Sequence, residues 1–120
     1  MHFTKLTPSL FYTDIRIGLK SFIDCLEFTI AHDEINSANP FCVVEKDGLG
    51  ILIFQDKGLA EQFSPEIRLV TPDIEEVYAR VSAKFPELLH PNLRVVTLRP
   101  WGAKEFALVD GQIGIIIQQW

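Results

Sequence analysis

The sequence has few cysteines and no long apolar run. Cys25 and Cys42 are its two cysteines, and because their spacing fits no metal-binding motif we interpret each as a buried free thiol. No apolar stretch approaches the length needed to cross a bilayer, and the N-terminus lacks the basic-then-apolar pattern of an export signal. We therefore expect a cytoplasmic protein with no membrane partner.

Basic residues are also in the minority, because 11 Lys and Arg face 16 Asp and Glu, for a net charge of −5. That balance argues against a nucleic-acid partner and suits a cationic one. The sequence contains no Gly-rich phosphate loop, no Ser-His-Asp arrangement and no CxxC motif. We interpret His2, His32 and His90 as solvated side chains, and we predict no catalytic residue.

The C-terminal part holds two apolar runs separated by Asp110-Gly111, a dipeptide suited to a tight hairpin turn. The first run alternates, which places Phe106 and Leu108 on one face and Glu105, Ala107 and Val109 on the other. The second run is almost continuously apolar, as expected of a strand buried on both faces. Ahead of both, Pro100-Trp101-Gly102 places an aromatic ring at a bend. We predict a hairpin that forms one wall of a cleft.

The rest of the chain shows further strands and two capped helices. Pro8 interrupts the first strand, which makes that strand an edge, a hinge or a bulge. Asp73 and Glu76 have the spacing of a capping box at the second helix. The expected elements are a strand over Lys5–Tyr12, a helix after Thr13 or Asp14, strands over Phe28–Ala31, Phe41–Glu45, Leu49–Gln55, Glu66–Thr71 and Leu93–Leu98, a loop over His32–Pro40, and a linker over Lys57–Ser64.

These signals recur in the same order in both halves: strand, capped helix, strands, then an Asp-Gly turn at Asp47 or Asp110. The pattern predicts an α+β protein in which residues 1–120 form one domain of two βαβββ modules, about 1–57 and 65–120. The alternative is a single mixed α+β sheet without symmetry.

The sequence resembles that of the glyoxalase/bleomycin resistance/dioxygenase (vicinal oxygen chelate) superfamily, and within it the bleomycin resistance proteins. The likeness covers nearly the whole chain and rests most on Pro100-Trp101-Gly102, Glu105-Phe106-Ala107-Leu108 and Asp110. It implies cupped mixed sheets and a homodimer whose clefts are shared between subunits, with Pro8 at a hinge where the first strand crosses to the partner. A monomer that closes its own two halves together is the alternative. Glu27, in place of the family's usual glycine, and the tight turn at Asp110-Gly111-Gln112 depart from the pattern.

Metalloenzymes of this superfamily carry four ligands on four strands. The resemblance places these positions at Thr7, about Leu52, Glu66 and about Ile115, of which only Glu66 is a competent metal ligand. We therefore expect no metal and no cofactor. The resemblance to metal-free relatives implies a structural or a ligand-contacting role for Glu66.

The resemblance and the aromatic residues together favour a small-molecule-binding protein that sequesters a bulky planar or cationic compound, as antibiotic-binding relatives do. The alternatives are a metal-dependent lyase, isomerase or dioxygenase, and a scaffold whose cleft is filled by its own side chains. For Phe54 and Phe106 the alternative is a purely structural role, because an aromatic residue on a strand commonly packs in the hydrophobic core. The candidate ligand-binding residues are Trp101, Phe41, Glu66, Phe54 and Phe106.

Overall fold

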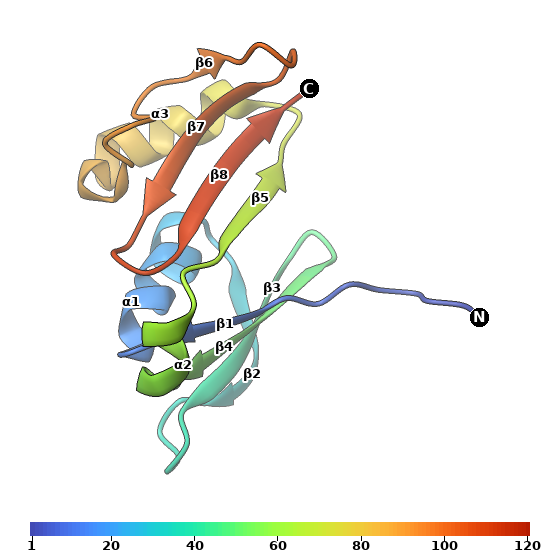
Figure 1. Cartoon of the computed structure of the whole chain (residues 1–120), viewed down its shortest axis with the longest axis vertical. Coiled ribbons are helices and arrows are strands. Elements are labelled where there is room, and N and C mark those ends of the chain that lie inside the picture. The colour runs from blue at the N-terminus through green and yellow to red at the C-terminus, as the bar shows by residue number, and fades with distance from the viewer. The chain divides into compact units, whose positions relative to one another are not determined.

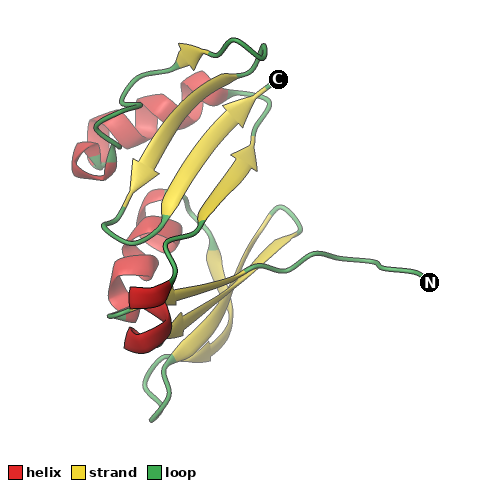
Figure 2. Cartoon of the chain, viewed as in Figure 1, coloured by secondary structure: helices red, strands yellow, loops and turns green.

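The computed structural model describes residues 1–120, which divide into two compact units, Met1–Phe63 and Ser64–Trp120. Each unit contains one four-stranded sheet, and helices cover one face of it (Figures 1 and 2). No helix is both long enough and apolar enough to cross a membrane.

The first unit orders its strands β1-β4-β3-β2, with β1 parallel to β4 and the other pairs antiparallel. A helix that is α-helical and then π-helical follows β1, and Asp14 caps it by accepting the Arg16 N–H. The elements are β1 (Ser9–Tyr12), α1 (Ile15–Leu19), the π-helix η1 (Lys20–Cys25), β2 (Thr29–Glu34), β3 (Phe41–Lys46), β4 (Leu49–Gln55) and α2 (Lys57–Gln62).

The second unit repeats this plan with the order β5-β8-β7-β6, and β5 is parallel to β8. Asp73 caps its long helix by accepting the Glu76 N–H, and the Asp73 N–H itself is bound by the Thr71 hydroxyl. The elements are β5 (Glu66–Val70), α3 (Ile74–Lys84), the 3₁₀ helix η2 (Pro86–Leu88), β6 (Thr97–Leu98), β7 (Lys104–Val109) and β8 (Gly114–Gln119).

The identical strand orders confirm the predicted duplication and the α+β fold class, and they exclude a single sheet. The two units also share a hydrogen bond between strand and helix. The Gln55 side chain, at the end of β4, accepts the Ile15 N–H at 3.0 Å. The Gln119 side chain, at the end of β8, accepts the Ile74 N–H at 2.8 Å. Each side chain satisfies one of the free N–H groups at a helix start.

Strand alternation gives each sheet a helix-covered face and an open face. In the first unit Tyr12 lies against Gly18 of α1, whereas Phe11 lies on the open face with Phe54. In the second unit Phe106 meets Tyr78 of α3 edge to face, with ring centroids 5.2 Å apart. The helix-covered sides form the cores, which include Leu10, Tyr12, Cys42, Val44, Ile51 and Ile53 in one unit and Phe106, Leu108, Ile115 and Ile117 in the other.

Four expected elements differ in the structure. The first strand begins only at Ser9, because Pro8 has no N–H for a ladder. The second strand continues through Glu34, so His32 lies on an exposed edge strand and not in a loop. Most of the expected linker is the helix α2, which Asp56 caps. The expected strand over Leu93–Leu98 is reduced to Thr97–Leu98.

Candidate functional site

The turn between β6 and β7 positions Trp101, as the sequence predicted. The Gly102 N–H donates to the Arg99 carbonyl at 2.9 Å, and the Arg99 N–H donates to the Ala103 carbonyl at 2.8 Å. Gly102 has φ +99°, a value that glycine adopts without a Cβ clash. This three-residue loop of Pro100, Trp101 and Gly102 leaves the Trp101 side chain half exposed.

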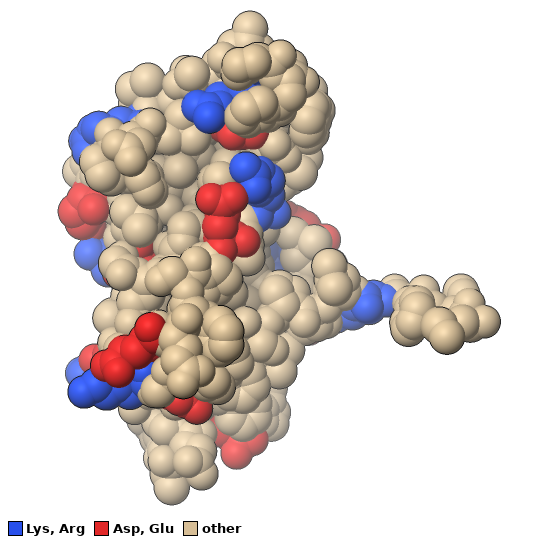
Figure 3. Space-filling view, in the orientation of Figure 1, with Lys and Arg blue, Asp and Glu red and all other residues tan.

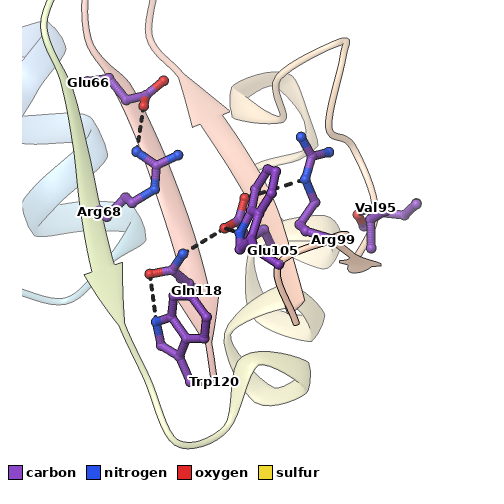
Figure 4. A network of polar contacts seen from close by, with 9 residues as sticks. Glu66, Arg68, Val95, Arg99, Glu105, Gln118 and Trp120 are labelled. Atoms are coloured by element: carbon purple, nitrogen blue, oxygen red, sulfur yellow. Dashed lines mark hydrogen bonds and ion pairs between the residues drawn. The ribbon is translucent and has the colours of Figure 1, made fainter. Parts of the chain in front are cut away.

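Beside this turn, Glu105 is a buried carboxylate on the open face of the second sheet, with 1% of its surface exposed. Its Oε2 accepts hydrogen bonds from Trp101 Nε1 at 3.1 Å and from Gln118 Nε2 at 2.7 Å. Gln118 Oε1 in turn accepts from Trp120 Nε1 at 3.1 Å. Figure 4 shows this chain of contacts crossing from β7 to β8. The network fixes the orientation of both indole rings.

Arg99 completes this group without making a side-chain hydrogen bond. Its Nε lies 3.8 Å from Glu105 Oε1, which is ion-pair distance, and that Nε is buried with no hydrogen-bond partner. Its guanidinium carbon lies 4.8 Å from the centre of the Trp101 ring. The aromatic face that we expected to attract a ligand cation therefore already holds a cation of this chain.

A pocket of about 420 Å³ lies on the open face of the second sheet. Its floor is apolar and comes from β7 and β8. The segment from His90 to Leu93 closes one side, because the His90 N–H donates to the Ala107 carbonyl at 2.8 Å and the Ala107 N–H donates to the Leu93 carbonyl at 2.9 Å. The polar side chains around it include Glu66, His90, Asn92 and Arg99.

Glu66 lines this pocket, as a ligand-contacting residue should, but its carboxylate is paired. Its Oε1 lies 2.7 Å from Nη1 of Arg68, two residues along the same strand (Figure 4). Both side chains are about half exposed. The pair presents little net charge to the pocket.

The open face of the first sheet carries a row of aromatic rings. Phe11 stacks on Phe54 and Phe54 stacks on Phe41, each pair with ring centroids 5.5 Å apart. His32 continues the row at 5.4 Å from Phe41. Phe11, Phe54 and Phe41 are partly exposed. The row, defined as Phe11, Phe54, Phe41 and His32, crosses all four strands. Its three phenylalanines are apolar, and its His32 end is polar because His32 Nε2 lies 2.6 Å from Glu34 Oε2.

The structure therefore distributes the predicted residues over two surfaces. Phe41 and Phe54 belong to the aromatic row of the first unit, and Glu66 and Trp101 belong to the open face of the second. The prediction that Phe106 lines the ligand-binding cleft is wrong. Phe106 is fully buried against α3, because it shares the helix-covered face of β7 with Leu108.

The interpretation of the histidines as solvated is wrong for His90, which is half buried and lines the pocket. It is confirmed for His32, whose side chain is 54% exposed at the end of the aromatic row. The sequence did not indicate Arg99, His90 or Gln118 as site residues. One signal pointed to Glu105, since the alternation of β7 already placed this carboxylate on the face opposite Phe106.

Three groups, Asp14, Arg16 and Cys42, have shifted pKa values, and none of them lines the pocket. Burial, with a smaller contribution from the charge of Asp33, raises the pKa of the Cys42 thiol to about 11. The hydrogen bonds from Arg16 lower the pKa of Asp14, a residue at the start of α1.

The positions that correspond to metal ligands in the superfamily do not fit a metal ion. Leu52 lies on the open face of β4 and has no donor atom. Ile115 is fully buried on the helix-covered side of β8, and its open-face neighbours Gly114 and Ile116 offer no side-chain donor either. No group of three His, Cys, Asp or Glu side chains is arranged to hold a metal ion.

Charged side chains of both signs are scattered in small groups over the face of the molecule shown in Figure 3. No continuous basic region is visible on that face, so it offers no extended track for a phosphate backbone.

No family model matches the sequence, and no curated protein matches it. Solved structures do match. A glyoxalase/bleomycin resistance protein/dioxygenase superfamily member from Sphaerobacter thermophilus DSM 20745 is 16% identical with a TM-score of 0.70, covering 98% of each chain. The chain has the glyoxalase/bleomycin resistance/dioxygenase fold.

Two further structures share this fold. The bleomycin-binding protein from bleomycin-producing Streptomyces verticillus, solved in complex with copper(II)-bleomycin, is 20% identical with a TM-score of 0.66, covering 98% of this chain and 96% of that one. TioX from Micromonospora sp. ML1 is 12% identical with a TM-score of 0.74, covering 97% of this chain and 98% of that one. At these identities the likeness shows the fold and leaves the function to be argued from the residues.

Proposed function

We propose that this chain is a metal-independent binding protein that sequesters a bulky planar or cationic compound, antibiotic-like in character, without transforming it. The cleft is completed across a homodimer interface. The observation that carries the proposal is the aromatic row of the first unit, which offers partly exposed, stacked rings to a planar ligand. The bleomycin-binding protein of the same fold supports the ligand class.

The metal-dependent enzyme is disfavoured by the chemistry of its donor positions. A divalent ion needs several nitrogen or oxygen donors that converge on it. Of the four positions, Leu52 and Ile115 are aliphatic, and Glu66 is engaged by Arg68 at 2.7 Å.

The homodimer is supported by the N-terminal segment, residues 1–7. This segment leaves the sheet of the first unit as an extended arm (Figure 1), and its apolar side chains Phe3 and Leu6 are 81% and 91% exposed. Exposed large apolar side chains in a short arm are typical of segments that cover a partner surface.

Binding is tested with two probes, ethidium and copper(II)-bleomycin, titrated into protein and followed by calorimetry. We expect saturable binding of at least one probe and recovery of that probe unchanged. The double substitution Phe41→Ala and Phe54→Ala should weaken binding at least about tenfold, since two stacking surfaces are lost. Phe63→Ala is the matched control, because Phe63 is exposed and lies outside the aromatic row.

If the double variant binds the probe with the same affinity as the parent, the aromatic row is not part of the binding site. For the dimer, deletion of residues 1–7 should shift the molar mass measured by light scattering from dimer toward monomer. A parent protein that is monomeric at all concentrations would contradict the shared cleft.

A further inference from the structure

The pocket on the open face of the second sheet presents hydrogen-bond donors that have no partner within the protein. We propose that it is an oxyanion subsite, in which Arg99 and His90 bind a carboxylate carried by an otherwise apolar or planar ligand. The inference deepens the proposed function and rests on it. The observations behind it concern only the second unit.

The Arg99 guanidinium is held in place but makes no hydrogen bond within the protein. Its Nε is buried without a hydrogen-bond partner, and its terminal nitrogens make no hydrogen bond to another group of the protein, although the side chain lines the pocket. Glu105 at 3.8 Å and the Trp101 ring at 4.8 Å fix its position. Figure 4 shows Nε turned toward Glu105 and the two terminal nitrogens turned away from it. A guanidinium edge oriented in this way matches the two oxygens of a carboxylate.

His90 supplies a second donor by virtue of its tautomer. Its Nδ1 accepts the Asn92 N–H at 3.0 Å, so the proton of the neutral ring lies on Nε2. Nε2 has no hydrogen-bond partner. The backbone hydrogen bond from His90 to Ala107 ties this segment to β7, which makes the donor part of a fixed wall.

The acidic side chains around the pocket are already neutralised or occupied. Glu66 is paired with Arg68 at 2.7 Å, and Glu105 accepts hydrogen bonds from Trp101 and Gln118. The floor is formed by Ala107, Val109, Gly114 and Ile116. An apolar floor lowers the local dielectric constant and strengthens a charge-assisted hydrogen bond made above it.

A cationic group fits this pocket poorly, because it would meet the Arg99 charge and find the facing ring of Trp101 already covered. An organic carboxylate satisfies both the donors and the apolar floor. Inorganic phosphate offers the same oxyanion chemistry without the apolar part, so a comparison of the two separates a carboxylate ligand from a free anion.

The test compares four probes by calorimetry: 2-naphthoate, its neutral amide 2-naphthamide, the cation 2-naphthylmethylammonium, and inorganic phosphate. We expect 2-naphthoate to bind about 10- to 100-fold more tightly than the amide, the range for charge-assisted hydrogen bonds. Phosphate should bind more weakly than 2-naphthoate. His90→Ala and Arg99→Gln should each remove most of the preference for carboxylate over amide, and Arg99→Lys should restore part of it.

Arg94→Gln is the matched control, because Arg94 is exposed in the same unit and does not line the pocket. If Arg99→Gln fails to fold, the double variant Arg99→Gln with Glu105→Gln removes both charges and takes its place. Equal binding of 2-naphthoate and 2-naphthamide, tighter binding of the cation or of phosphate, or an unchanged preference in His90→Ala and Arg99→Gln overturns the inference. Ethidium binding that depends on Phe41 and Phe54, measured on the same preparations, reports on the proposed function separately.

Discussion

Trp101 donates its indole N–H to the buried carboxylate of Glu105 at 3.1 Å, and so the exposed ring at the β6–β7 turn is anchored from inside the sheet. The same oxygen accepts from Gln118 at 2.7 Å, and Arg99 supplies the opposite charge at 3.8 Å. The Glu105 side chain thus connects the β6–β7 turn, the neighbouring strand β8 and Arg99 at the edge of the pocket.

Replacement of Glu105 by Ala should lower the free energy of unfolding by about 2–3 kcal/mol, because it leaves an arginine charge and two N–H donors without their acceptor. Glu105→Gln keeps the shape of the side chain and should cost less. Urea denaturation measures both, and Lys104→Ala, at the exposed first residue of the same strand, is the control. A loss no larger than that of the control would mean that the network does not stabilise the unit.

Glu27 occupies a position suited to glycine. It has φ +62°, and it follows the π-helix where the Phe28 N–H donates back to the Phe22 carbonyl at 2.8 Å. Glu27→Gly should therefore stabilise the protein by about 0.5–1 kcal/mol, and Glu27→Val, with a branched Cβ, should destabilise it. Thermal denaturation of the two variants beside the parent checks the order. Greater stability of the valine variant would contradict it.

Gly18 and Gly58 lie in helical segments but should respond oppositely to alanine. A Cβ at Gly18 would lie 2.6 Å from Cε2 of the buried Tyr12, and this overlap should cost about 1–3 kcal/mol. A Cβ at Gly58 of α2 meets only Asp56 Oδ1, at 3.6 Å, so Gly58→Ala should stabilise by about 0.5–1 kcal/mol. Chemical denaturation gives both values. Two changes of the same sign would show that packing around Tyr12 is not the deciding factor.

The Cys42 thiol should be inert in the folded protein. It is fully buried and its pKa is raised to about 11 from an ordinary value of 9.0, so little thiolate forms at pH 8. Because the folded-state pKa is the higher one, its contribution to stability is complete below pH 9.0 and is lost as the pH rises through about 11.

Labelling with iodoacetamide at pH 8 should be slow until urea unfolds the chain. The decline of the urea midpoint between pH 9 and pH 11 should be smaller in Cys42→Ala than in the parent. Rapid labelling of Cys42 without denaturant would contradict its burial.

The sequence predicted which residues share a face of a strand better than it predicted which face lines the cleft. Alternation over Glu105 to Val109 assigned both faces of β7 correctly, and the same pattern should have excluded Phe106 from the cleft. The extension of β2 through Glu34 was not predicted because its residues are polar, and an exposed edge strand shows no alternation of apolar residues. The short helix α2 was missed because one capping residue, Asp56, was its main signal.

The pocket could not be predicted from the sequence, for a physical reason. His90 and Arg99 reach the open face of the second sheet from irregular segments, which have no period to read. Their positions depend on tertiary contacts, namely the backbone bonds of the His90–Leu93 segment to Ala107 and the hairpin bond between Arg99 and Ala103. Sequence patterns carry little information about such contacts.

Calorimetric titration of EDTA-treated protein with ethidium and 2-naphthoate tests the central claim most directly, since it asks for binding with divalent metal removed. We predict saturable binding of at least one of the two probes, tighter than about 1 mM, with the probe recovered unchanged. Absence of binding by both, or binding that appears only when a divalent metal is restored, would contradict the account.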